Sequence, residues 1–337
     1  MRRRPEAPRD PVRLAVIGAG GIAQAYAHLL ADSPDAVAVG VTDVRPEAAQ
    51  AWAASVGCPV AESPEALLDL EPDAVVICTP PSTHADLAAT FLGNDVAVLS
   101  EKPLSINQES ARSMTEMSDH HETMLAMAAK FRFCQDLQRS VELMADGSLG
   151  SIRLIENAFT SRIDMSQRWN SQRPLSGGGV IIDNGTHSVD LVSWLGGAIT
   201  EVRAEEQARP HGFEVEDTAR LHLVTENGID VTVDLSWSID KALPDFVRVF
   251  GTEGELRVGW QSSAWRRYDQ HWEPIGTGYS KFEAMGGALA QFCRAVRGDE
   301  RPAVDGRSAV RTAAVIDAAY DSLATGTWTK VVDDRAC

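Results

Sequence analysis

The first 128 residues alternate short apolar runs with helix-like segments, and this alternation constrains the fold more than any other feature. The apolar runs show no polar alternation, and helical patterns separate them. Such a pattern is typical of a parallel β-sheet that helices cover on both faces. The predicted strands are 12–17, 36–42, 74–77, 96–100 and 124–128.

Residues 18–23 follow the first predicted strand and have the pattern G-x-G-x-x-A. In such a turn the first glycine, Gly18, permits the tight bend, and Gly20 lets the backbone approach a pyrophosphate. The N–H groups at the start of the following helix, at Gly21 and Ile22, would then face the phosphates. The turn therefore predicts a dinucleotide site, although a similar turn can also bind another ligand.

Asp43 stands at the end of the next predicted strand, 20 residues after Ala23. A carboxylate there hydrogen-bonds the adenosine ribose hydroxyls and repels a 2′-phosphate, so NAD is the predicted cofactor. Arg45 lies two residues further on and could cover a phosphate, so NADP remains an alternative.

Lys102 lies in the motif Glu101-Lys102-Pro103, directly after the strand predicted at 96–100. Because ligands of open α/β sheets bind beyond the carboxyl ends of the strands, we expect this lysine to face the cleft. The alternative is an ordinary surface lysine. The position is informative because the chain contains only five lysines, at positions 102, 130, 241, 281 and 330.

Asp183 and His187 lie four residues apart in a helix that the pattern predicts over 177–195, so they share a helix face. An aspartate beside a histidine fixes its tautomer and tunes its basicity, as acid–base chemistry requires. A solvated face, a buried structural histidine and a metal site are the alternatives. A metal site needs about three protein ligands, and since the sequence offers no clear third ligand, we predict no metal.

The second half of the chain has short strand-like runs separated by turn signals, which predict a mostly antiparallel sheet. The predicted strands are 152–160, 202–208, 218–225, 229–237, 246–250 and 255–258, and the predicted helices are 135–145, 177–195, 282–296 and 307–323. We predict a disordered arm over 1–11, a doubly wound α/β domain over 12–130, and an α+β domain with a large open sheet over 131–337.

Composition narrows the classes of partner. A formal net charge of −17 argues against nucleic acid and favours neutral or cationic substrates, unless Arg162, Arg168 and Arg173 reverse that preference locally. No apolar run approaches the roughly 20 residues of a membrane helix, so no membrane partner is predicted. The five cysteines are far apart and odd in number, as expected of unpaired thiols in the cytoplasm.

Together these segments resemble the Gfo/Idh/MocA family (glucose-fructose oxidoreductase, inositol dehydrogenase, rhizopine catabolism). The resemblance rests on the glycine turn, on the Glu-Lys-Pro motif around Lys102 and on the glycine-led pattern that contains Asp183 and His187. Further similar segments are 79–84, 131–133 and 302–306, so the resemblance extends over nearly the whole chain after residue 11.

The resemblance implies roles for individual residues. Lys102 would be the active-site lysine, Asp183 with His187 the catalytic pair, and Asp43 the ribose ligand. Trp169 and Arg173 would reach toward the nicotinamide or the substrate. The residues implied to lie along the cofactor are Cys78, Thr79, Pro80, His84, Glu101 and Lys102 itself. The open sheet of the second domain often forms a dimer or tetramer interface in this family.

We therefore predict an NAD(P)-dependent dehydrogenase that transfers hydride between nicotinamide and a ring hydroxyl or ketone of a sugar, cyclitol or aminosugar. In this hypothesis His187 takes the hydroxyl proton, Asp183 orients His187, and Lys102 hydrogen-bonds the oxygen, although Lys102 and His187 could exchange roles. The alternatives are an NADPH-dependent ketoreductase of a nucleotide-linked sugar and a nicotinamide-binding regulatory protein without turnover.

Overall fold

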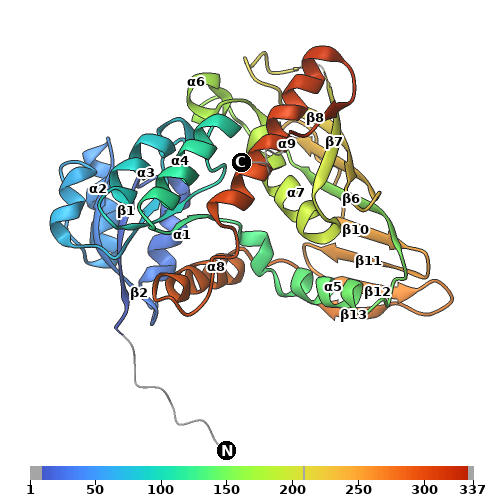
Figure 1. The fold of residues 1–337 in the computed structure, drawn as a ribbon, viewed down its shortest axis with the longest axis horizontal. Coiled ribbons are helices and arrows are strands. Elements are labelled where there is room, and N and C mark those ends of the chain that lie inside the picture. Colours follow the sequence, from blue (N-terminus) through green and yellow to red (C-terminus); the bar gives the residue numbers. More distant parts are fainter. Residues whose placement is uncertain (1–9, 208, 333–337) are drawn as a thin grey trace, which may run out of the picture.

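The computed structural model describes residues 10–207 and 209–332 and contains two β-sheets (Figure 1). The predicted arm over 1–11 lies almost wholly outside these residues. The first sheet has five strands that are all parallel, as the sequence predicts, and their order is β2-β1-β3-β4-β5. Its strands are β1 (Val12–Ile17), β2 (Ala36–Thr42), β3 (Ala74–Ile77), β4 (Ala97–Ser100) and β5 (Leu125–Met127).

Helices cover both faces of this sheet, and this is why its strands carry no polar alternation. All four residues of β3 are buried; Val76 packs into one hydrophobic cluster, whereas Val75 and Ile77 pack into another on the opposite face. The elements between the strands are α1 (Gly21–Leu30), α2 (Pro46–Val56), η1 (Glu65–Leu70), η2 (Pro81–Thr83), α3 (His84–Leu92) and α4 (Gln108–His120).

The second sheet has nine strands in the order β13-β12-β11-β10-β6-β9-β8-β7-β14. All its pairs are antiparallel except β6 with β9. The strands are β6 (Ile152–Thr160), β7 (Ile199–Glu206), β8 (Thr218–Thr225), β9 (Asp230–Ser236), β10 (Asp245–Gly251), β11 (Gly254–Gly259), β12 (Ser263–Arg267), β13 (Glu273–Gly276) and β14 (Thr329–Lys330). The short strands β12, β13 and β14 were not predicted, and of these β13 and β14 form the two edges of the sheet. Strand β7 begins three residues earlier than predicted.

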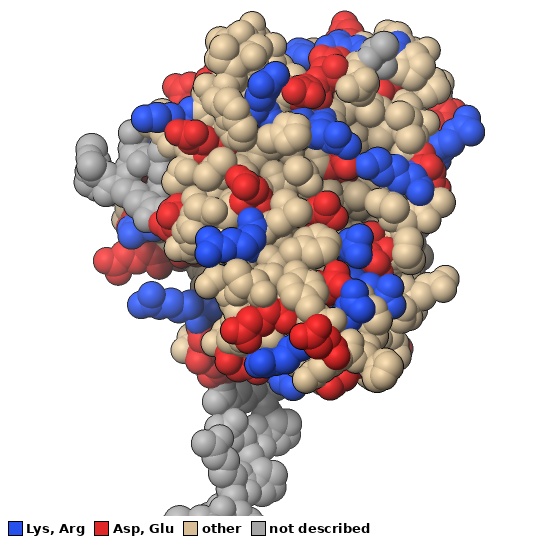
Figure 2. Space-filling view, turned by 90° about the vertical axis from the view of Figure 1, so that its right-hand side faces the viewer, with Lys and Arg blue, Asp and Glu red and all other residues tan. Residues whose placement is uncertain are grey.

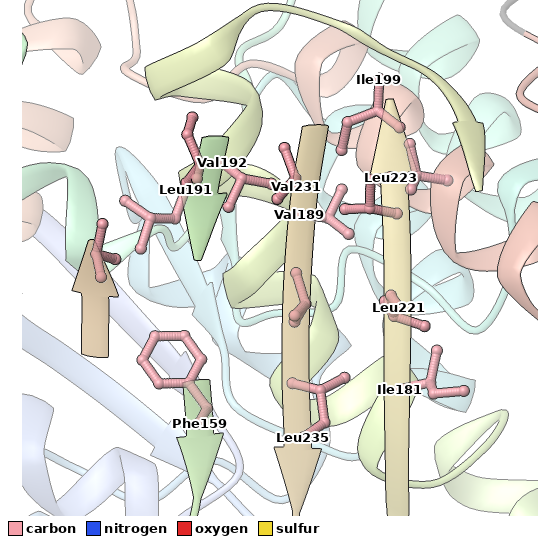
Figure 3. Packing of buried hydrophobic residues seen from close by; sticks show 14 of the residues in the cluster. Phe159, Ile181, Val189, Leu191, Val192, Ile199, Leu221, Leu223, Val231 and Leu235 are labelled. Atoms are coloured by element: carbon pink, nitrogen blue, oxygen red, sulfur yellow. The ribbon is translucent and has the colours of Figure 1, made fainter. Parts of the chain in front are cut away.

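The remaining helices are η3 (Lys130–Phe133), α5 (Gln135–Ala145), η4 (Trp169–Ser171), α6 (Arg173–Ser176), α7 (Val180–Gly196), α8 (Lys281–Val296) and α9 (Gly306–Thr325). Both α7 and α9 pack on one face of the second sheet. Figure 3 shows Ile181, Val189 and Val192 of α7 against Leu221 and Leu235 of the sheet, where they form one buried cluster. Helix α7 begins at Val180, three residues later than the helix predicted over 177–195.

The two domains are less separate than the predicted boundary at residue 130 suggests. α8 follows strand β13 of the second sheet in the sequence, yet its Met285, Leu289 and Phe292 are buried in a hydrophobic cluster with Ala23 and Tyr26 of α1. The apolar side of α8 therefore completes the core of the first domain. A boundary at residue 130 separates the two sheets, but the core of the first domain also contains residues of α8 from beyond that boundary.

Among the described residues, no helix is both long and apolar enough to cross a membrane.

Candidate active site

A cavity of about 1260 Å³ runs along the carboxyl ends of the first sheet and continues to α7 and the second sheet. The strand order predicts this place, because ligands of doubly wound sheets bind beyond the carboxyl ends of the strands. Residues of both domains form its wall. The predicted site residues that line it are Gly18, Gly20, Gly21, Ile22, Asp43, Arg45, Cys78, Thr79, Pro80, Glu101, Lys102, Asp183 and His187.

The glycine turn forms one end of this cavity. Gly18 has a φ of +90°, and a side chain there would lie 3.0 Å from the carbonyl group of Cys78, so the position requires glycine. A side-chain carbon at Gly20 or Gly21 would meet no atom within 4 Å, so a ligand can approach this backbone. α1 begins here without a side-chain cap, which leaves its first N–H groups free for an anion such as a pyrophosphate.

Asp43 is held beside this turn with its side chain only 8% exposed. Its Oδ2 accepts a hydrogen bond from the N–H of Ala19 at 2.6 Å, and its Oδ1 accepts one from the N–H of Arg45 at 2.8 Å. The Arg45 side chain is 64% exposed. A fixed carboxylate at this point fits the ribose hydroxyls of NAD, because the 2′-phosphate of NADP would meet the same carboxylate.

His84 does not line the cavity, contrary to the role that the family resemblance implies for it. The side chain is 1% exposed and lies beneath the site. Its Nε2 lies 2.9 Å from the carbonyl oxygen of Thr79, and its Nδ1 lies 3.0 Å from both Ser100 Oγ and the carbonyl oxygen of Pro103. Burial lowers the pKa of His84, so the neutral ring joins the loop after β3 to the loop that carries Lys102.

Lys102 and Asp183 meet across the cavity from different domains. Lys102 Nζ donates to Asp183 Oδ1 at 2.6 Å and to the carbonyl oxygen of Asp183 at 3.0 Å. Both side chains are less than one-fifth exposed, at 17% and 18%. The predicted contact between Asp183 and His187 is therefore replaced by an ion pair with Lys102, since the carboxylate turns toward the nearby ammonium group.

Glu101 is buried beside Lys102. Its Oε1 accepts a hydrogen bond from Tyr26 Oη at 3.0 Å, and its Oε2 accepts one from the N–H of Lys102 at 3.2 Å. Burial raises the pKa of Glu101, and the positive charges of Lys102 and Lys130 oppose that rise. Glu101 thus holds the backbone of Lys102 in place.

His187 lies one turn beyond Asp183 on α7 and faces the cavity. Its ring meets Phe131 edge-on at 5.2 Å, and no residue of the described chain hydrogen-bonds it. Burial and the charges of Lys102 and Lys130 hold the pKa of His187 well below its usual range, so the ring is neutral at pH 7 and can accept a proton. Over residues 10–207 and 209–332, no three potential metal ligands come together.

The start of α7 is fixed by Glu216, a buried residue just before β8. Glu216 Oε1 accepts hydrogen bonds from the N–H groups of Gly179 and Ile181, at 2.9 and 3.1 Å, and from Tyr320 Oη at 2.8 Å. A side-chain carbon at Gly179 would lie 1.9 Å from the Glu216 carbonyl oxygen, so only glycine allows this approach. These contacts set the position of Asp183 and His187 relative to the sheet.

Sequence reasoning missed several residues of the cavity wall. Lys130 follows β5, and its place after a strand in a lysine-poor chain was the available signal. Arg132 of η3 pairs with Asp190 of α7 at 2.8 Å, which anchors the segment beside Lys130. Besides Trp169, which the resemblance implied, the aromatic side chains of the wall are Phe131, Phe159, Trp237, Trp260 and Tyr279. Of the two residues implied to reach the site, Trp169 lines the cavity and Arg173 does not.

The two halves of the chain match the two domains of one family. Residues 12–129 match the oxidoreductase family with an NAD-binding Rossmann fold, and residues 137–257 match the Gfo/Idh/MocA C-terminal domain. The chain belongs to the Gfo/Idh/MocA oxidoreductase family. This confirms the family resemblance, the predicted fold class and the NAD-binding first domain.

Named relatives match different parts of this chain, and the match covers different shares of their own length. Inositol 2-dehydrogenase of Rhizobium meliloti (strain 1021) is 30% identical over 236 residues, which are 69% of this chain but only 61% of that relative. The rhizopine catabolism protein MocA of Rhizobium meliloti is 27% identical over 317 residues, or 92% of this chain and 95% of that protein. The crystal structure of GenD2 from gentamicin A biosynthesis in complex with NAD has a TM-score of 0.85 and 26% identity, covering 98% of this chain and 99% of GenD2.

Proposed function

We propose that this protein is an NAD-dependent dehydrogenase that oxidises a ring hydroxyl of a sugar or cyclitol. The observation that carries the proposal is the Lys102–Asp183 ion pair beside His187, in the same cavity as the glycine turn and Asp43. The relatives' names, inositol 2-dehydrogenase and rhizopine catabolism protein, support a polyhydroxylated substrate. The predicted inclusion of aminosugars rests on the net charge alone.

NAD, when bound, would accept the hydride. The residues of this chain would accept the proton of the substrate hydroxyl. Lys102 has three N–H donors, and two of them are directed at Asp183. The third is free to hydrogen-bond the substrate oxygen and stabilise its developing negative charge. His187, neutral at pH 7, takes the hydroxyl proton. Asp183 acts by holding Lys102 rather than by orienting His187.

The test is the reduction of NAD by the purified protein over a panel of sugars, inositols, aminocyclitols and nucleotide sugars. We expect the absorbance of reduced nicotinamide to rise with at least one sugar or cyclitol, and the rise to depend on both Lys102 and His187. Binding of NAD without turnover across the whole panel would contradict a dehydrogenase and favour a regulatory protein.

Asp43 is expected to set the preference for NAD over NADP. Replacing Asp43 with serine removes the carboxylate that faces the ribose, so kcat/KM with NAD should fall by roughly 10–100-fold while that with NADP rises. Steady-state kinetics with both cofactors at fixed substrate measure the effect. The matched control is Asp86→Ser, which removes an exposed carboxylate that lines the cavity away from the glycine turn. An unchanged cofactor ratio in Asp43→Ser would contradict this role.

We also infer that copies associate through the open face of the second sheet as a dimer or tetramer. Helices α7 and α9 cover only one face, and the other carries charged residues such as Arg220, paired with Asp234 at 2.7 Å. Figure 2 faces this side of the molecule and shows basic and acidic side chains interspersed on it. Light scattering should give two or four times the mass of one chain, and Arg220→Glu should lower it. The mass of a single chain for the unaltered protein would contradict the inference.

A cytoplasmic location is part of the same proposal. Its support is that the four cysteines within the described residues, Cys58, Cys78, Cys134 and Cys293, are free thiols, as in reducing compartments.

A further inference from the structure

Lys130 is a charged side chain of the cavity that the proposed mechanism does not use. It begins η3, directly beyond the carboxyl end of β5, and lines the cavity with Lys102, Asp183 and His187. Within the described chain it makes no hydrogen bond or ion pair, and its Nζ lies 5.5 Å from the centre of the Phe131 ring. Because a partly buried ammonium group without a direct ion-pair partner is unfavourable, we expect Lys130 to pair with a group from outside the chain.

Two carboxylates near Lys130, those of Glu101 and Asp183, favour its charged form, but neither forms an ion pair or hydrogen bond with it. From the loop after β4, Glu101 already accepts from Tyr26 and from the Lys102 N–H. From α7, Asp183 is occupied by Lys102, and His187 is neutral. Burial is the main cause that lowers the pKa of Lys130 to about 8, so the side chain is still mostly protonated at pH 7.

Lys281 adds a second unpaired ammonium group to the same cavity. It is the first residue of α8, it lines the cavity, and no acidic side chain of the described residues pairs with it. Its charge is near enough to lower the pKa of Lys130. Three of the five lysines of the chain therefore lie in one cavity, although arginine supplies the basic charge almost everywhere else. Lysine differs from arginine in presenting a compact point charge that fits a confined anionic group.

We propose that Lys130, with Lys281, binds an anionic group of the substrate, so that the substrate is a sugar or cyclitol derivative carrying a carboxylate or a phosphate. This inference rests on the proposed dehydrogenase function and names the substrate class of that same site. The net charge of −17 does not oppose it, because salt screens exposed charges beyond about 8 Å, whereas Lys130 meets the ligand directly. The nearby Phe131 and Phe159 rings offer an apolar surface for the C–H face of such a ring.

The test measures binding of three probes to the NAD-loaded protein by calorimetry: D-glucose, D-glucuronate and D-glucose 6-phosphate. We expect at least one of the acids to bind about tenfold or more tightly than glucose, and Lys130→Met to remove that difference. The two acids distinguish a carboxylate from a phosphate. Lys330→Met, a lysine replacement on edge strand β14 away from the cavity, is the matched control and should bind all three probes like wild type.

The pH dependence gives a readout that a merely structural lysine would not give. Affinity for the acid should decline as the pH rises through about 8, where Lys130 loses its proton, and Lys130→Arg should keep its affinity to higher pH. The thermal melting temperature of Lys130→Met shows whether that variant is folded. If it is not folded, the pH dependence of acid binding to Lys130→Arg still tests the inference.

Two results would overturn the inference: neither acid binds better than glucose, or Lys130→Met weakens all three probes equally. These outcomes are separate from those of the proposed function. Turnover of neutral sugars without any advantage for acids rejects the inference and keeps the dehydrogenase. Binding of an acid that depends on Lys130, without NAD reduction by any sugar acid or phosphate, keeps the anion site and rejects the dehydrogenase.

Discussion

Replacing Lys102 with methionine is expected to lower kcat by about 10²–10³-fold, because it removes the donor placed to stabilise negative charge on the substrate oxygen. The donor is placed by two hydrogen bonds to Asp183 that leave one N–H free. The NAD site should change much less, because the glycine turn and Asp43 lie at a different part of the cavity. Steady-state kinetics and a calorimetric titration with NAD measure the two effects separately.

Asp183→Asn tests whether the aspartate acts through the lysine. If it does, the double variant of Lys102→Met with Asp183→Asn should be little slower than Lys102→Met alone, since residues of one ion pair lose their effects together. Fully additive losses would show that Asp183 has a separate role, such as the orientation of His187. A kcat within about threefold of wild type in Lys102→Met would remove the lysine from the mechanism.

Replacing His187 with glutamine is expected to lower kcat/KM by about 10²–10⁴-fold at neutral pH, the range typical of a lost general base. Its neutral ring is the active form. Because burial, Lys102 and Lys130 hold the pKa of His187 well below its usual range, activity should persist as the pH falls below 6.5 and be lost only in more acid solution.

A profile of kcat/KM against pH for the wild type and His187→Gln checks this expectation. The acid limb of the wild type should lie below pH 6.5, the usual value for histidine, and the variant should lack that limb. Lys130→Met should move the limb toward higher pH, because one positive charge that lowers the pKa of His187 is gone. A limb in alkaline solution that persists in His187→Gln would assign proton transfer to a lysine instead.

Much of the site follows from local sequence patterns joined to one rule of topology. Gly18 and Lys102 both follow apolar runs, and the carboxyl ends of neighbouring parallel strands meet at one edge of a sheet. Asp183 and His187 share a helix face because they are four residues apart. Such features depend on spacing over a few residues, so they can be predicted from the sequence without knowledge of the fold.

The contacts that these side chains make could not be predicted from local sequence patterns. Lys102 and Asp183 are 81 residues apart in the chain and belong to different domains, and their contact displaces the predicted one between Asp183 and His187. His84 lies in a segment that resembles a cofactor-binding one, yet it is buried under the loop of Lys102. Lys130 follows a predicted strand, but only the structure shows that it shares one cavity with Lys102 and Lys281.

The sequence by itself determined the doubly wound first domain, the glycine turn and the candidate reactive side chains, since periodicity, glycine spacing and residue chemistry are local properties. The tertiary structure alone decided that α8 completes the first core, that Asp183 pairs with Lys102, and that Lys130 lies in the cavity without an ion-pair partner among the described residues. Contacts between distant segments depend on how whole elements pack, and local patterns do not encode that packing.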